Sequence, residues 1–206
     1  MATGVALAMQ REGKGRVCVC FFGDGAANTG SFHEGLNLAA IWKLPVVYIC
    51  ENNQYGEAMP AREFVAGYPV SNRAKAYGLK GTTIDGNDIE TVVKKSEKGV
   101  AQARSGEGPV FIEMVTYRFR GHYVGDPEHT YRTKEEVESW REKCPLVRFR
   151  KRLLEKVCDE SSITAIEKEV IKELKDEEAW ALEQPFPTVE QATDHVMIPL
   201  TQRKER

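Results

Sequence analysis

One stretch, residues 23–56, constrains the fold of this chain more than any other. Two apolar runs, residues 17–22 and 46–50, are each followed directly by a polar segment that contains glycine or asparagine. Between these runs, residues 31–43 have apolar side chains at helical spacing, which predicts a helix that buries Phe32, Leu36, Leu38, Ala39 and Trp42. A strand–helix–strand unit has a right-handed crossover, so both polar segments should meet at the carboxyl edge of one parallel sheet.

The two polar segments carry the residue types that bind a metal ion together with a phosphate group. Gly23 and Gly25 let the backbone approach an anion closely, and the free amides of a following helix can bind phosphate. Asp24 supplies a carboxylate and Asn53 an amide carbonyl, both of them oxygen ligands of the kind that Mg²⁺ prefers. Either segment by itself is more often an ordinary turn, but the pair, each after an apolar strand, favours a shared site.

This combination resembles the thiamine diphosphate motif. The segments that begin at Asp24 (DGAANTG), Leu38 (LAAIWKLP) and Glu51 (ENNQYG) resemble the α subunit of the decarboxylating component of 2-oxo acid dehydrogenase complexes, a group that includes acetoin dehydrogenase. The resemblance covers about residues 2–182. It implies a thiamine diphosphate cofactor, with Mg²⁺ bound by the residues Asp24, Asn53 and Tyr55 (the last through its backbone carbonyl) and with diphosphate contacts from Gly25 and Ala26.

A second segment with functional character, residues 118–133, follows an apolar run at residues 110–115. Long polar loops at the carboxyl end of a parallel strand are favoured places for function. Residues 117–122 resemble the family sequence Tyr-Arg-X-X-Gly-His, which implies that His122 faces the reactive ring of the cofactor as the catalytic residue. A structural histidine is the alternative. Arg118 would balance diphosphate charge, with an ion pair inside the loop as the competing interpretation.

The resemblance implies an enzyme that decarboxylates a 2-oxo acid such as pyruvate, or cleaves acetoin, and transfers the acyl group to lipoyl of the acyltransferase component. The implied partners are a β subunit, in a heterotetramer of two α and two β, and the lipoyl acyltransferase core. Members of the family are longer, so a missing N-terminal half of the subunit is a further expected partner. Tyr123 stands where phosphorylated relatives have a serine, which argues against control at that point, and residues 121–127 look closer to acetoin-type and bacterial pyruvate-type members.

Two other function classes compete with this one. A catalytically inactive, truncated subunit that acts only as an interaction partner is supported by the missing half, but the presence of Asp24, Asn53 and His122 argues against it. An ordinary nucleotide-binding domain would carry Gly-X-Gly-X-X-Gly after its first strand, and this chain does not.

The whole pattern predicts an α/β fold: a three-layer, mostly parallel sheet with helices on both faces (the thiamine diphosphate-binding fold), followed by a helical extension. Residues 1–133 are expected to form the C-terminal part of the α/β domain and residues 134–206 the helical extension and tail. A helix over residues 89–104 should bury Val92, Val93, Val100 and Ala101, and an apolar stripe on residues 162–183 should pack on the domain or on a partner. A sheet edge or an apolar face is expected to be exposed.

Composition narrows the partners and the compartment. The 29 basic and 31 acidic residues nearly balance, which gives no argument for binding to nucleic acid or to a membrane. No apolar run approaches the length of a membrane span. Five cysteines without metal-site or disulfide spacing fit a reducing cytoplasm, with a transit peptide on a longer precursor as the alternative.

Overall fold

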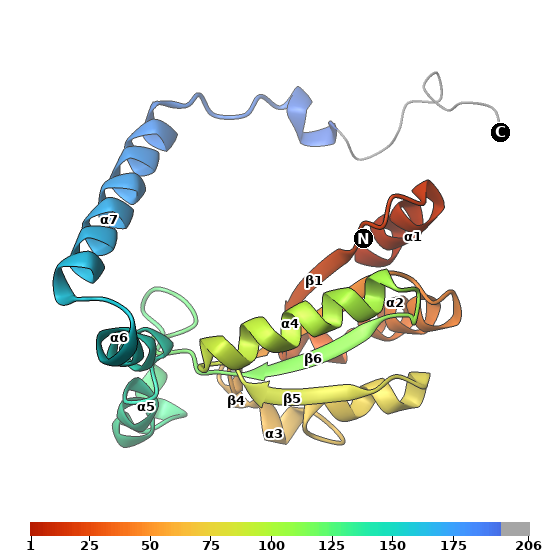
Figure 1. Ribbon diagram of the computed structural model, residues 1–206, viewed down its shortest axis with the longest axis horizontal. Helices are drawn as coiled ribbons and strands as arrows, with labels where there is room; N and C mark the ends of the chain where they lie inside the picture. Colours follow the sequence, from red (N-terminus) through yellow and green to blue (C-terminus); the bar gives the residue numbers. More distant parts are fainter. Residues whose placement is uncertain (195–206) are drawn as a thin grey trace. The chain divides into compact units, whose positions relative to one another are not determined.

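The computed structural model describes residues 1–194, and Figure 1 shows their helices and strands. The α-helices (α), strands (β) and 3₁₀ turns (η) follow the chain in this order: α1 Ala2–Glu12, β1 Cys18–Gly23, η1 Gly25–Asn28, α2 Gly30–Ile41, β2 Val46–Asn52, β3 Tyr55–Gly56, β4 Met59–Pro60, α3 Ala61–Phe64, η2 Val70–Tyr77, β5 Gly81–Asp85, α4 Ile89–Arg104, β6 Val110–Val115, η3 Glu128–Thr130, α5 Lys134–Arg141, α6 Pro145–Lys156, α7 Glu160–Glu183 and η4 Glu190–Thr193.

Four parallel strands form the main sheet, in the order β1-β2-β6-β5. Gly23 lies beside Glu51, and Asn52 lies beside Val115, so β1, β2 and β6 all end at one edge of the sheet. The strand–helix–strand prediction is therefore confirmed, and the two polar segments lie at the same edge. A short antiparallel pair, β3 with β4, lies in the segment just after β2.

Helices cover both faces of the sheet, as predicted (Figure 1). On one face, α1, α2 and η2 pack against alternate residues of β2 and β6, including Val46, Tyr48, Cys50 and Phe111. On the other face, α4 packs against the residues between them, including Val47, Ile49 and Ile112. The near-continuous apolar sequence of β2 follows from this arrangement, because both of its faces are buried.

Several side chains predicted to be buried are exposed. On α2, Leu36 and Ala39 are buried, but Leu38 and Trp42 are exposed because only one stripe of the helix faces the sheet and the helix ends at Ile41. On α4, Val92 and Val100 are partly buried against the sheet as predicted, while Val93 and Ala101 are exposed. In both helices the apolar spacing identified the helix but overestimated the width of its buried face.

Strand β1 lies at an edge of the sheet, and its outer face is largely bare. Phe21 is 63% exposed and Val19 is 40% exposed, although an uninterrupted apolar run such as residues 17–22 is typical of a strand buried on both faces of a parallel sheet. The cause is the position of α4, which packs on β2, β5 and β6. The expected exposed edge and apolar face are confirmed at β1.

The chain divides into two compact units, residues 1–153 and the residues from Leu154 onward. Helix α7 belongs to the second unit and starts at Asp159, whose carboxylate accepts a hydrogen bond from the Ser162 N–H. Of the predicted apolar stripe on this helix, Ile163 is buried and Ile166, Val170 and Leu174 are exposed. Among the described residues, none of the helices combines the length and the apolar character needed to cross a bilayer.

Candidate functional site

A cavity of about 510 Å³ lies at the carboxyl ends of the strands. Every residue that the sequence analysis assigned to the metal, the diphosphate or catalysis lines it: Asp24, Gly25, Ala26, Asn53, Tyr55, Arg118 and His122. These seven residues come from three separate loops, after β1, β2 and β6. The structure therefore brings all of the predicted site residues together.

Asp24 is the most buried charged group of the cavity. Its side chain is 1% exposed, and its Oδ2 atom has no hydrogen-bond partner. Burial raises the pKa of the Asp24 carboxyl, while backbone N–H groups, including that of Asn53, and the charge of Arg118 act in the opposite direction. An ionised carboxylate with a free, buried oxygen is costly unless a positive charge compensates it. A cation bound at this oxygen would supply that charge.

Two consecutive asparagines form two overlapping turns next to Asp24. The Gln54 N–H donates to Asn52 Oδ1 at 3.0 Å, and the Tyr55 N–H donates to Asn53 Oδ1 at 3.1 Å. Gln54, which follows the two asparagines, has a φ of 75°, an uncommon conformation for a residue other than glycine. A carbonyl oxygen has two lone pairs, so Asn53 Oδ1 keeps one for a further partner. These turns fix where the Asn53 and Tyr55 oxygens lie.

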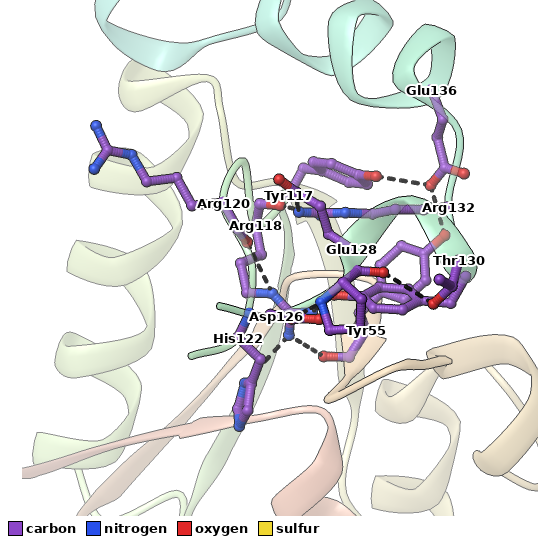
Figure 2. Close-up of polar contacts among 12 residues, drawn as sticks. Tyr55, Tyr117, Arg118, Arg120, His122, Asp126, Glu128, Thr130, Arg132 and Glu136 are labelled. Atoms are coloured by element: carbon purple, nitrogen blue, oxygen red, sulfur yellow. Dashed lines mark hydrogen bonds and ion pairs between the residues drawn. The ribbon is translucent and has the colours of Figure 1, made fainter. Parts of the chain in front are cut away.

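Arg118 joins the loop after β6 to the loop after β2. Its Nη1 donates to the Tyr55 carbonyl at 3.3 Å, its Nη2 to the Glu57 carbonyl at 2.6 Å, and its Nε to the Arg120 carbonyl at 3.2 Å. Figure 2 shows Arg118 within this network and the Arg120 side chain directed away from it. These acceptors are carbonyl oxygens, two of them in the other loop, and not the carboxylate that an ion pair inside the loop would need; the Arg118 side chain also lines the cavity.

His122 is exposed on the cavity wall and is held on two sides. Its backbone N–H donates to Asp126 Oδ2 at 2.6 Å, which is the main reason that the pKa of Asp126 is lowered. Its ring Nδ1 lies 3.4 Å from Arg118 Nη1. A guanidinium can only donate, so in this arrangement Nδ1 accepts and the proton of the neutral ring is on Nε2. A Cβ on Gly121 would lie 2.7 Å from Asp126 Cβ, so this close turn requires glycine.

A largely buried cluster of aromatic and charged groups lies beside the loop (Figure 2). The Tyr55 and Tyr117 hydroxyls both donate to Glu136 Oε1, at 2.8 and 2.9 Å, and burial together with Glu136 raises the pKa of Tyr117 to about 12. Arg132 is buried, forms an ion pair with Glu128 and lies against the rings of Tyr55, Tyr117 and Tyr131. Helix α5 therefore anchors the His122 loop to the Tyr55 turn.

Sequence reasoning did not find several groups of the cavity wall: Asn28, Gly56, Glu57, Met59 and Phe64. Asn28 closes the rim because its Nδ2 donates to the Phe64 carbonyl at 3.1 Å. The glycine at position 56 could have indicated a close contact, since a Cβ there would lie 2.6 Å from the Phe64 ring. Nothing in the residue type of Glu57 indicates its place in the cavity wall, because its φ of 57° lies in the left-handed region that glutamate rarely adopts.

The residues present fit a metal ion that is shared with a bound diphosphate. Within residues 1–194, no group of three or more His, Cys, Asp or Glu side chains could hold a metal by itself. The cavity instead offers one carboxylate, an amide oxygen and a backbone carbonyl, a set that leaves coordination positions for phosphate oxygens.

Comparison with known proteins gives a family for this chain. Residues 1–190 match the family model described as "Dehydrogenase E1 component". The chain is 44% identical over 188 residues to the α subunit of acetoin:2,6-dichlorophenolindophenol oxidoreductase from Bacillus subtilis, covering 91% of this chain and 56% of that protein. It is 38% identical to the pyruvate dehydrogenase E1 component α subunit of Rhizobium meliloti, covering 96% and 57%, and 37% identical to the somatic mitochondrial form from Sus scrofa, covering 95% and 50%.

The chain thus spans about half the length of the curated relatives that it matches. The family match covers most of this chain, from α1 through α7, and includes every loop that lines the cavity. This chain belongs to the dehydrogenase E1 component family.

Proposed function

We propose that this chain is the part of an E1 α subunit that holds the diphosphate of thiamine diphosphate through Mg²⁺. The observation that carries the proposal is the cavity that gathers Asp24, Asn53, Tyr55, Arg118 and His122, with one buried Asp24 oxygen unpaired. The complete enzyme would decarboxylate a 2-oxo acid such as pyruvate, or cleave acetoin, and transfer the acyl group to lipoyl.

Asp24, Asn53 and Tyr55 would bind the metal ion. Asp24 supplies the negative charge, and the Asn53 side chain and the Tyr55 carbonyl supply neutral oxygens at fixed positions. The backbone at Gly25 and Ala26, in η1 directly after Asp24, would contact the diphosphate. When bound, thiamine diphosphate supplies the carbon nucleophile and the electron sink, and the protein supplies binding and orientation.

His122 would act on a proton or on developing charge near the reacting groups. Because Nδ1 accepts from Arg118, Nε2–H is the free group of the ring, and it can donate a hydrogen bond to an oxygen that gains negative charge. Asp126 holds the His122 backbone and Arg118 contacts the ring at Nδ1, and neither contact uses Nε2. His122 would thus be a donor in its neutral form.

The names of the relatives support one of the proposed partners, a β subunit. Because these are α subunits, we propose a β subunit that completes the active site, in an assembly of two α and two β, and a lipoyl acyltransferase that receives the acyl group. The higher identity to the acetoin-named relative, 44% against 38% for the first pyruvate-named one, supports acetoin as the substrate to test first.

The metal assignment is tested by Asp24→Ala in the assembled enzyme that contains this chain. Titration calorimetry should show that Mg²⁺-dependent binding of thiamine diphosphate is lost, while circular dichroism shows a folded chain. The matched control is Asp176→Ala, an exposed aspartate of α7 that pairs with Lys172, and it should bind normally. Near-normal affinity in Asp24→Ala would overturn the assignment.

The substrate is tested with the unaltered enzyme. Reduction of 2,6-dichlorophenolindophenol, the electron acceptor in the name of the Bacillus subtilis relative, should be measured with acetoin, pyruvate and branched-chain 2-oxo acids in turn. A kcat/KM for acetoin at least tenfold above the others would support an acetoin enzyme. A preference for pyruvate would assign the chain to the pyruvate type instead.

A further inference from the structure

A carboxylate with no assigned role, Glu113, lies buried in the middle of β6. Its side chain is fully shielded from solvent, at 0% exposed, on the face of the sheet that packs against η2. Four groups donate to it: Asn52 Nδ2 at 2.7 Å, the Val70 N–H at 3.2 Å, the Ser71 N–H at 2.9 Å and the Thr83 hydroxyl at 3.1 Å. All four donors are neutral.

Burying the carboxylate of Glu113 has a cost in free energy, which indicates that it has a role. In the part of the chain that the structure describes, Glu113 has no ion pair, so its charge is stabilised by hydrogen bonds alone. Removing a carboxylate from water costs several kcal/mol unless its oxygens are well hydrogen-bonded. An apolar residue, such as Phe111 on the same strand face, would fill the space without that cost.

The hydrogen bond to Asn52 links Glu113 to the metal-binding turn. Asn52 is itself fully buried, and its amide can donate to Glu113 only if its Oδ1 points the opposite way, toward Gln54. There Oδ1 accepts from the Gln54 N–H at 3.0 Å and from Gln54 Nε2 at 3.1 Å. These bonds hold Gln54 at its φ of 75°, a conformation that costs about 1 kcal/mol or more for such a residue.

The position of Gln54 decides where its neighbours point. Asn53 precedes it, and Tyr55 follows it with an N–H that donates to Asn53 Oδ1. If Gln54 relaxed to an ordinary negative φ, the Tyr55 carbonyl and the Asn53 side chain would turn relative to Asp24. The remaining donors to Glu113 come from η2 and β5, which fix the carboxylate from the side away from the turn.

We propose that Glu113 is a positioning residue for the metal site: through Asn52 it holds the Gln54 turn that directs the Asn53 and Tyr55 oxygens at the ion bound by Asp24. A negative charge on Glu113 also helps to raise the pKa of Asp24, and a cation bound at Asp24 would offset this repulsion between the two carboxylates. The inference rests on the proposed function, because the ion that it serves is the Mg²⁺ of that site.

The test compares two variants of the link to the turn, at Glu113 and at Asn52, with one variant at Thr83, a donor from β5. Glu113→Gln keeps the shape but removes the charge, and Asn52→Ala removes the link to Gln54. Thr83→Val is the matched control, since it removes a donor to Glu113 Oε2 but leaves Asn52 in place. Mn²⁺ affinity in the presence of thiamine diphosphate, followed by electron paramagnetic resonance on the assembled enzyme, should fall at least tenfold in the first two variants and less than twofold in Thr83→Val.

Hydrogen exchange of the Gln54 amide, without metal, gives a second readout. In Glu113→Gln this amide should exchange at least tenfold faster than in the unaltered protein, although Asn52 is still present, and in Thr83→Val its rate should be unchanged. A folded Glu113→Gln protein with a protected Gln54 amide and unaltered Mn²⁺ affinity overturns the inference. If Glu113→Gln does not fold, unaltered Mn²⁺ affinity in Asn52→Ala overturns it.

Asp24→Asn separates this inference from the proposed function. If Asp24→Asn weakens Mn²⁺ binding and neither Glu113→Gln nor Asn52→Ala does, the proposed function stands and the positioning role of Glu113 is wrong. If Asp24→Asn leaves Mn²⁺ binding unchanged, the metal site itself is wrong, and the inference about its positioning falls with it.

Discussion

The two halves of the site are built in different ways. The half that contains Asp24, Asn53 and Tyr55 follows directly from strand ends and is held by buried side chains and backbone hydrogen bonds. The half that contains His122 lies in a loop between β6 and α5, and His122 itself is exposed. Side-chain contacts with Arg118, with Asp126 and with the cluster under α5 hold that loop in place.

This difference indicates a division of labour. A metal ion binds best to oxygens whose positions do not change, and the turn half provides them in advance. A group that acts on a substrate has to admit that substrate and release the product, and an exposed loop with a few side-chain links can do so. Substitutions in the turn half should therefore affect cofactor binding, and substitutions in the loop half should affect turnover.

The largest expected effect on turnover is that of His122→Ala. Turnover should fall roughly a hundredfold or more, the usual range for a positioned acid–base group. Thiamine diphosphate affinity should change little, because Asp24, Asn53 and Tyr55 are unaltered. The loss should be larger for transfer to a lipoyl domain than for reduction of an artificial electron acceptor, and both rates are measured on one preparation.

His129→Ala is the matched control, an exposed histidine in η3 of the same loop. It should keep both rates. If His122→Ala also keeps both rates within a factor of three, His122 is structural, and the proposed division between the two halves is wrong.

The next effect in size is that of Arg118→Lys, which tests the connection between the halves. Lysine keeps the charge that would balance a diphosphate, but it cannot reach the Tyr55, Glu57 and Arg120 carbonyls together. Losing a charged hydrogen bond costs about 2 kcal/mol, so turnover should fall about thirtyfold, with a parallel loss of cofactor affinity. A variant with unaltered affinity and turnover would show that only the charge matters.

Asp126→Ala should have a smaller effect that is confined to the loop half. It removes Asp126 Oδ2, which accepts from the His122 backbone N–H and, at 2.7 Å, from the Tyr131 hydroxyl. Turnover should fall about tenfold, equivalent to about 1.4 kcal/mol, with cofactor affinity unchanged. Tyr131→Phe is the graded comparison: it leaves Asp126 bound to His122 and should cost about threefold. Equal losses in the two variants would mean that the Tyr131 hydroxyl, which also accepts from Arg118 Nη2 at 3.1 Å, matters more than the hydrogen bond to the His122 backbone.

The turn half was largely predictable from sequence for the same reason that it is rigid. Gly23, Asp24 and Asn53 are adjacent to apolar runs, and the topology of parallel strands then brings them to one edge. The strands and helices followed from apolar spacing in the same way. The exposure of Phe21 was not predictable, since it depends on the place of β1 in the sheet order, which local pattern does not determine.

The supporting contacts of the loop half could not be predicted from spacing. Glu136 joins Tyr55 and Tyr117 from a helix far along the sequence, and Arg132 is buried among three tyrosine rings although arginine is usually exposed. His122 itself was predicted only through a resemblance to a family sequence. Long-range side-chain contacts of this kind depend on the folded arrangement, not on local propensity.

The smallest expected effect is on stability without ligand, and it concerns Asp24 alone. Burial raises the pKa of Asp24 in the folded chain above its unfolded value of about 3.9. Between the unfolded pKa of Asp24 and its raised folded pKa, the folded state binds the proton more tightly than the unfolded state. The stability of the metal-free protein should therefore fall as pH rises through that window and stay lower above it. Asp24→Asn removes the titrating group and should be flat over the same range.

Thermal melts of the two proteins should therefore nearly coincide below pH 4, and Asp24→Asn should melt a few degrees higher at pH 7, because each kcal/mol shifts the midpoint by about 2–4 °C at this size. Adding Mg²⁺ and thiamine diphosphate to the assembled enzyme should reverse the order, since only the unaltered carboxylate gains a cation. An Asp24→Asn protein that melts lower than the unaltered one without ligand would mean that Asp24 stabilises the turn half by itself. The carboxylate would then be part of the fold and not a group that awaits a metal ion.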